Sequence, residues 1–96
     1  MTYVVAATWT AREGEEERVA RILERITPLC RSEPACRLYQ AHRSPEDRRR
    51  FFIYEQYDDE AGFVAHTKTA HVEELVRGEA VPLLEGRERV FYVTMG

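Results

Sequence analysis

Two histidines and one glutamate are the residues of this chain best suited to acid–base chemistry. His66 and His71 lie five positions apart, and Glu55 ends an apolar run before them. An imidazole needs little perturbation to remove a phenolic proton near neutral pH, and a buried carboxylate is costly unless it has a partner or a function. We therefore predict that His66, His71 and Glu55 are catalytic. The alternative for each is a structural role, as a hydrogen-bonding partner or, for Glu55, in an ion pair with an arginine.

The spacing of the histidines does not follow a metal-binding motif. Residues five positions apart on an unbroken helix point in different directions, so His66 and His71 are not a zinc pair of the i, i+4 type. A break in the helix at 67–69 would let both face a sheet. A metal site formed by His42, His66, His71, Glu55 and a cysteine is the alternative, but no spacing among these residues supports it. We predict no metal site and no bound cofactor, and the chain has neither a Gly-rich phosphate loop nor a nucleophile elbow.

The elements that must position these residues can be read from the hydrophobic pattern. Strands are expected at 3–11, 36–43, 50–57 and 87–95; the first is rich in Val, Thr, Tyr and Trp, and the third carries several aromatic residues. A first helix should follow Gly14, because acidic residues crowd its start. Its apolar stripe has helical spacing and consists of Val19, Ile22, Leu23, Ile26 and Cys30.

The ends of the two helical regions are marked by helix breakers and caps. We expect Pro28 to distort or end the first helix, and Asp58 or Asp59 to cap the second. Residues 67–69 should interrupt the second helix, which Gly78 then ends, and 79–86 should be a connector. The resulting order, β-α-β-β-α-β, predicts an α+β fold of the ferredoxin-like type. Both helices should lie on one face of a four-stranded antiparallel sheet, with the first and third strands at its centre.

Both faces of this sheet are expected to be apolar. The third strand carries Phe51 and Ile53 on one side but Phe52 and Tyr54 on the other. Two helices can cover only one face, and an uncovered apolar face would exceed the patches that monomers usually expose. We therefore expect a two-fold homodimer that hides this face. The alternative is a monomer whose bare face carries enough polar atoms to tolerate water.

The stretch from Phe52 to Val72 resembles the signature of the antibiotic biosynthesis monooxygenase family. Its members have a strand ending in Glu-x-Trp/Tyr, an acidic cap, an Ala-aromatic pair and two histidines five residues apart. The matching positions here are Glu55, Tyr57, Asp58 or Asp59, Ala61, Phe63, His66 and His71. Gly62 moves the aromatic residue one place later than in the commonest form. Length and element order agree along essentially the whole chain, which we interpret as one domain, 1–96.

The resemblance implies a dimeric α+β barrel with a pocket in each subunit. Characterised relatives oxidise phenols or hydroquinones to quinones with O2, without metal or flavin, and others degrade haem. The haem degraders share an Asn-Trp-His set, whereas this chain has no Asn and its single Trp9 lies on the first strand, which argues against haem cleavage. A small aromatic substrate and O2 are thus the expected partners. The expected pocket lining, which could instead be ordinary packing, is Tyr39, Tyr54, Tyr57, Phe63 and Tyr92.

Two other functions stay open beside the monooxygenase. One is a dimeric module that binds a small apolar ligand without converting it, and the other is haem binding. Composition excludes further classes: the net charge of −3 gives no basic field for nucleic acid. No apolar run approaches the length of a membrane span or reads as a signal peptide. Two cysteines are too few for a disulfide framework, so we expect a cytoplasmic protein with free thiols.

Overall fold

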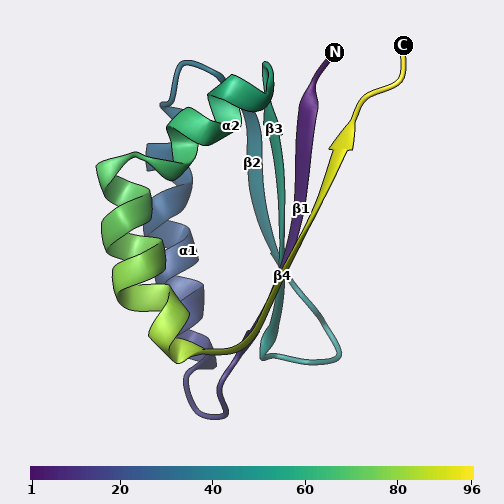
Figure 1. Ribbon diagram of the computed structural model, residues 1–96. Coiled ribbons are helices and arrows are strands. Elements are labelled where there is room, and N and C mark those ends of the chain that lie inside the picture. Colours follow the sequence, from purple (N-terminus) through teal and green to yellow (C-terminus); the bar gives the residue numbers. More distant parts are fainter.

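The computed structural model describes residues 1–96 and has the predicted α+β fold. Its strands are β1 (Tyr3–Ala11), β2 (Cys36–Arg43), β3 (Arg50–Tyr57) and β4 (Leu84–Val93). They form one antiparallel sheet in the order β2-β3-β1-β4. Its helical elements are α1 (Glu16–Arg31), α2 (Glu60–Thr67), a π-helical segment η1 (Val72–Ala80) and a 3-10 turn η2 (Val81–Leu83). Figure 1 shows the helices on one side of the sheet and the other side uncovered.

Helix α1 buries the predicted stripe and extends past its proline. Glu16 and Glu17 occupy the first turn, where negative charge is favourable. Pro28 does not end the helix, which runs on to Arg31, because a proline removes only its own N–H donor. The N–H of Ser32 still bonds to the carbonyl oxygens of Pro28 and Leu29, at 3.2 and 3.3 Å.

The second helical region is interrupted where predicted but ends later. Asp59 caps α2 by accepting a hydrogen bond from the N–H of Gly62 at 2.8 Å, and the helix stops at Thr67. The prediction that Gly78 ends the region is wrong, because η1 passes through Gly78 to Ala80. The prediction of a connector at 79–86 is also wrong, because β4 begins at Leu84, which pairs with Ala11. The strand predicted at 87–95 therefore starts three residues earlier, and it ends at Val93. Ala80 and Leu84 are buried four positions apart, so packing on the core extends the segment.

The core lies between the sheet and the helices. It combines residues of all four strands, of α1 and of η1, including Ala7 and Trp9 of β1, Ile22 and Ile26 of α1, Ile53 of β3, and Leu75 and Val76 of η1. No helix of the protein is long and apolar enough to cross a membrane.

Strand register decides which side chains reach the helices and which do not. Directly paired residues share a face of a sheet, so the pairs Ala7–Ile53 and Ala7–Arg89 lie on the helix face. The residues that alternate with them lie on the uncovered face, which we call the open face. Four large side chains of that face are more than one-third exposed: Leu38, Phe52, Val90 and Tyr92.

Candidate active site

The candidate site begins with a carboxylate shared by two histidines. Both oxygens of Glu33 lie 3.0 Å from Nδ1 of His66, and Oε2 lies 2.5 Å from Nε2 of His71. Glu33 follows the end of α1, His66 lies in α2, and His71 precedes η1. The break after Thr67 turns the chain so that two residues five positions apart reach one acceptor.

A second carboxylate lies on the other side of His66. Glu55 projects from β3 on the helix face, where only 6% of it is exposed. The Tyr57 hydroxyl donates a hydrogen bond of 2.6 Å to Oε1 of Glu55, and Nε2 of His66 lies 3.5 Å from the same oxygen. A continuous polar chain therefore runs from His71 through Glu33, His66 and Glu55 to Tyr57.

Burial shifts the proton affinities along this chain. It raises the pKa of Glu55 to about 7, although the hydrogen bond from Tyr57 and the charge of Arg89 act in the opposite direction. Burial lowers the pKa of His66, and the neighbouring Glu33 opposes that change. A carboxylate accepts hydrogen bonds only, so the neutral His66 carries its proton on Nδ1, toward Glu33. Its Nε2 lone pair then faces Glu55.

His66 and Glu55 border a small cavity between the sheet and the second helical region. Its volume is about 40 Å³, whereas an apolar cavity that holds benzene is about 150 Å³. Aromatic and charged side chains form its wall beside these two residues: Trp9, Tyr39, Phe63, Arg77, Arg87 and Arg89. The Arg89 guanidinium lies 5.8 Å from the centre of the Phe63 ring, so a cation–π contact joins two of the lining residues.

The structure brings most of the predicted site residues together. His66, Glu55, Tyr39 and Phe63 line the cavity, while Tyr57 reaches it only through Glu55. His71 lies behind Glu33, at the far end of the polar chain.

Two predicted lining residues lie elsewhere. Tyr54 pairs with Ala6, and Tyr92 pairs with Val4, which places both tyrosines on the open face. The prediction that they line the pocket is therefore wrong for this subunit. Successive strand residues alternate between faces, so Tyr54 cannot share the face of Glu55.

Sequence reasoning missed Glu33, Arg87 and Arg89. Glu33 lies between the first predicted helix and the strand predicted at 36–43, and a signal for its role existed. A carboxylate just beyond the C-terminal end of a helix faces the negative end of the helix dipole, which suggests that a specific partner holds it there. The two arginines lie in β4. Which residues of β4 face the helices follows from its register with β1, and the sequence alone does not give that register.

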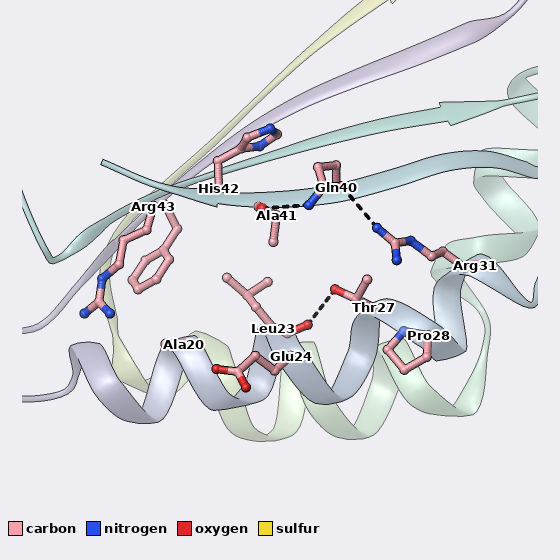
Figure 2. Close-up of a pocket in the computed structure, with 11 residues that line it drawn as sticks. Ala20, Leu23, Glu24, Thr27, Pro28, Arg31, Gln40, Ala41, His42 and Arg43 are labelled. Carbon is pink, nitrogen blue, oxygen red and sulfur yellow. Dashed lines mark hydrogen bonds between the residues drawn. The ribbon is translucent and has the colours of Figure 1, made fainter. Parts of the chain in front are cut away.

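A larger groove of about 510 Å³ lies between α1 and β2. Figure 2 shows that several of its polar side chains already have partners: Arg31 donates to Gln40 at 3.2 Å, and Thr27 donates to the Leu23 carbonyl at 2.6 Å. No cluster of titratable groups comparable to that around Glu33 borders it. We therefore place the chemistry in the small cavity, where such groups converge.

Comparisons with known proteins agree with this architecture. Residues 2–78 match the family model described as antibiotic biosynthesis monooxygenase, so the chain belongs to that family. No curated protein sequence matches the chain.

Solved structures resemble the protein over nearly their whole length. PA3566 from Pseudomonas aeruginosa is 27% identical, with a TM-score of 0.91 and coverage of 99% of this chain and 95% of that chain. SO0527 from Shewanella oneidensis is 24% identical, with a TM-score of 0.89 and coverage of 95% and 88%. An antibiotic biosynthesis monooxygenase is 21% identical, with a TM-score of 0.90 and coverage of 100% of both chains.

Proposed function

We propose that the protein is a cofactor-independent monooxygenase that oxidises a phenol or hydroquinone to a quinone with O2. The observation that carries the proposal is the orientation of His66. Glu33 holds its Nδ1 side, and its Nε2 side lies toward Glu55 at an aromatic-lined cavity. A base fixed in one tautomer by a carboxylate suits proton removal from a bound hydroxyl group. Membership of a monooxygenase family supports the same reaction class.

The reaction balances without another reductant. His66 takes the phenolic proton, and the phenolate passes one electron to O2. In a phenol the phenoxyl radical and superoxide combine at the para ring carbon, and in a hydroquinone they combine at an ortho carbon that bears hydrogen. The imidazolium returns its proton to the resulting peroxide. Loss of the hydrogen on that carbon, with cleavage of the O–O bond, then gives a new carbonyl and one water. Four electrons thus pass from the substrate to O2, with one oxygen atom in the product and one in water.

Other residues of the cavity have matching roles in this scheme. Arg87 and Arg89 place positive charge where phenolate and superoxide form, which favours both anions electrostatically. Tyr39 and Phe63 provide an apolar wall for an aromatic ring. Glu33 and His71 are positioning residues that hold His66. Because the cavity is smaller than a benzene ring needs, we propose that Phe63 and Arg89 separate when the substrate enters.

The test is turnover of anthrone and of naphthohydroquinones by chelator-treated protein. We expect one O2 consumed per quinone formed and, from ¹⁸O2, one labelled oxygen in each anthraquinone. The His66→Gln variant should lower kcat by about 10²–10⁴-fold, the usual contribution of a general base. Lys68→Gln is the matched control, because Lys68 is an exposed residue just beyond α2. Equal rates for His66→Gln and wild type would remove His66 from the mechanism.

The aromatic lining of the cavity also supports a second candidate, a module that binds an apolar ligand without converting it. Tight binding of an aromatic compound, unchanged after incubation in air, would favour this candidate over the oxygenase. Haem is a weaker alternative, because pockets for larger ligands are usually about 300–1,000 Å³. A Soret band after addition of haemin would support haem binding.

We propose in addition that two copies pair through the open face. Leu38, Phe52, Val90 and Tyr92 are exposed there, and a second copy presents the same apolar surface, as a two-fold interface requires. Sedimentation at micromolar concentration should give the dimer mass, and Val90→Glu should give single chains. Arg21→Glu, on the solvent side of α1, is the control. A wild-type protein that sediments as single chains would contradict this interface.

A further inference from the structure

Four potential metal ligands converge where α1 ends. Cys30, Glu33, His66 and His71 each offer a ligand atom, and these four atoms all lie within 4.8 Å of one another. None of the four side chains is exposed. From this juxtaposition we propose that Cys30, Glu33, His66 and His71 form a binding site for a divalent transition metal, with Zn²⁺ as the best match.

The spacing of the ligand atoms suits a tetrahedral ion. Zinc bonds of about 2.0–2.3 Å hold tetrahedral ligands about 3.3–3.8 Å apart. Carboxylate oxygens of Glu33 lie 3.0 Å from Nδ1 of His66 and 2.5 Å from Nε2 of His71, which is closer than that. No two of the four ligand atoms are more than 4.8 Å apart. Shifts of about 1 Å or less in the ligand atoms would bring them to the separations of a tetrahedral zinc site. These bonds would replace the hydrogen bonds that now join the same atoms.

The types of ligand select the metal. Two imidazoles, one thiolate and one carboxylate form a mixed nitrogen, sulfur and oxygen set, which Zn²⁺ accepts and which Mg²⁺ and Ca²⁺ disfavour. The thiolate and the carboxylate carry two negative charges, which the ion neutralises in a buried place. Binding releases the Cys30 thiol proton, whereas each neutral imidazole keeps its one proton on the nitrogen that does not bind the ion, so metal affinity rises with pH.

A second observation supports a metal ligand at His66. Metal-bound histidines usually donate their other ring N–H to a carboxylate or carbonyl, which fixes the ring. When Nδ1 of His66 binds the ion, Nε2 carries the proton, and Oε1 of Glu55 lies 3.5 Å away to accept it. Tyr57 in turn donates to that carboxylate. The outer contacts that a zinc-bound histidine requires are thus already present.

Two short chain segments supply all four ligands. Cys30 and Glu33 are three positions apart at the end of α1, where the N–H of Glu33 bonds to the Cys30 carbonyl at 3.1 Å. His66 and His71 flank the break between α2 and η1. An ion bound to all four would fasten the end of α1 to the second helical region, so it should stabilise the fold.

The test uses Co²⁺ as a spectroscopic substitute for Zn²⁺ on chelator-treated protein under reducing conditions. We expect the ligand-field bands of a tetrahedral ion, together with a thiolate-to-cobalt charge-transfer band, and their loss when Zn²⁺ is added. The melting temperature should rise with Zn²⁺ but not with Mg²⁺. None of these measurements depends on oxygenase activity, so the metal site and the proposed function can fail separately.

Variants locate the ion. Cys30→Ser should remove the charge-transfer band, and the matched control Cys36→Ser should keep it, because Cys36 is outside the cluster. Loss of a hydrogen-bond partner behind a metal ligand typically weakens binding about 10–100-fold, and His71→Gln, which removes a ligand itself, should weaken zinc binding at least as much. This variant tests the site independently if Cys30→Ser fails to fold. Absence of the cobalt spectrum in folded wild type, or its persistence in Cys30→Ser, would overturn the proposal.

Discussion

Nε2 of His66 lies 3.5 Å from Oε1 of Glu55, and each side chain is less than one-tenth exposed. The same burial raises the proton affinity of the carboxyl group and lowers that of the imidazole. The usual order of the two pKa values is therefore reversed, because the pKa of Glu55 is raised to about 7 while that of His66 is lowered from 6.5. Near neutral pH, Glu55 is thus the group of the pair that takes up a proton, which leaves His66 neutral as a general base requires.

The raised pKa of Glu55 predicts a pH-dependent stability. The folded pKa is about 7 and the ordinary value 4.5, so between these pH values the folded chain binds one more proton than the unfolded chain. Stability from this group is present below pH 4.5 and declines as the pH rises to 7, by about 3 kcal/mol. In Glu55→Gln that decline should disappear, so the variant gains stability relative to wild type as the pH rises.

Urea unfolding of metal-free protein at pH 5 and pH 8 measures this difference. Glu46→Gln, in the exposed turn before β3, should follow wild type at both pH values. The same offset between Glu55→Gln and wild type at pH 5 and pH 8 would contradict the raised pKa.

The lowered pKa of His66 predicts the acid limit of turnover. The base must be neutral to accept the phenolic proton, and burial holds its pKa below 6.5. In metal-free protein, kcat/KM should stay constant as the pH falls to 6.5 and decline only below that value. Steady-state rates between pH 4.5 and 8 would show the decline, and a midpoint above 6.5 would indicate another group as the base.

Removal of the cavity arginines should reduce turnover more than binding. If Arg87 and Arg89 stabilise charge that develops during the reaction, Arg87→Met and Arg89→Met should each lower kcat with little change in KM. The loss of one such contact typically costs about 10²–10³-fold in kcat. Because both side chains are exposed, the lower figure is expected. Arg21→Met is the control. An unchanged kcat in Arg87→Met and Arg89→Met would mean that these arginines line the cavity without taking part in the reaction.

Gly62 is required by a close contact and not by an unusual backbone angle. A Cβ atom at this position would lie 2.7 Å from Cβ of Ala35, so Gly62→Ala must push α2 away from the chain that follows Glu33. We expect a loss of about 1–3 kcal/mol in the free energy of unfolding. At Gly78 the nearest atom would be 3.4 Å away, so Gly78→Ala should cost much less. Thermal melts of the two variants compare them directly.

Zinc should inhibit the oxygenase if both proposals hold. An ion bound to Nδ1 of His66 leaves the proton on Nε2, so the imidazole can no longer accept one from a substrate. Stoichiometric Zn²⁺ should therefore lower kcat at least about 10-fold, and a chelator should restore it, while Cys36→Ser behaves as wild type. Full activity in zinc-loaded protein would exclude His66 Nε2 as the base.

The fold could be predicted closely because local patterns determine most of its elements. The bounds of β1, β2 and β3 agree with the sequence prediction at both ends. β1 and β3 are compact runs rich in β-branched and aromatic residues, and turn residues before and after β2 mark its ends. The end of the second helical region could not be predicted. Gly78 resembles a stop, but the burial of Val76 and Ala80 against the core outweighs its low helix propensity.

The site was only partly predictable. His66 and Glu55 were found because their residue types suit the chemistry, and they do meet. Glu33 was missed because its role depends on a contact with residues 33 and 38 positions away. The error at Tyr54 and Tyr92 arose because aromatic type was considered without the side of the sheet on which each residue lies.

The wide turn of η1 accommodates one residue more than an α-helical turn would. A π-helix has hydrogen bonds between residues i and i+5, whereas an α-helix has them between residues i and i+4. Deletion of one exposed residue such as Glu73 should therefore convert the wide turn into an ordinary α-helical turn, with the residues before and after it still facing the same way. His71 would then still reach Glu33, and Leu75 and Val76 would stay in the interior. A homologue with a gap at this point should therefore keep the histidine–carboxylate contact.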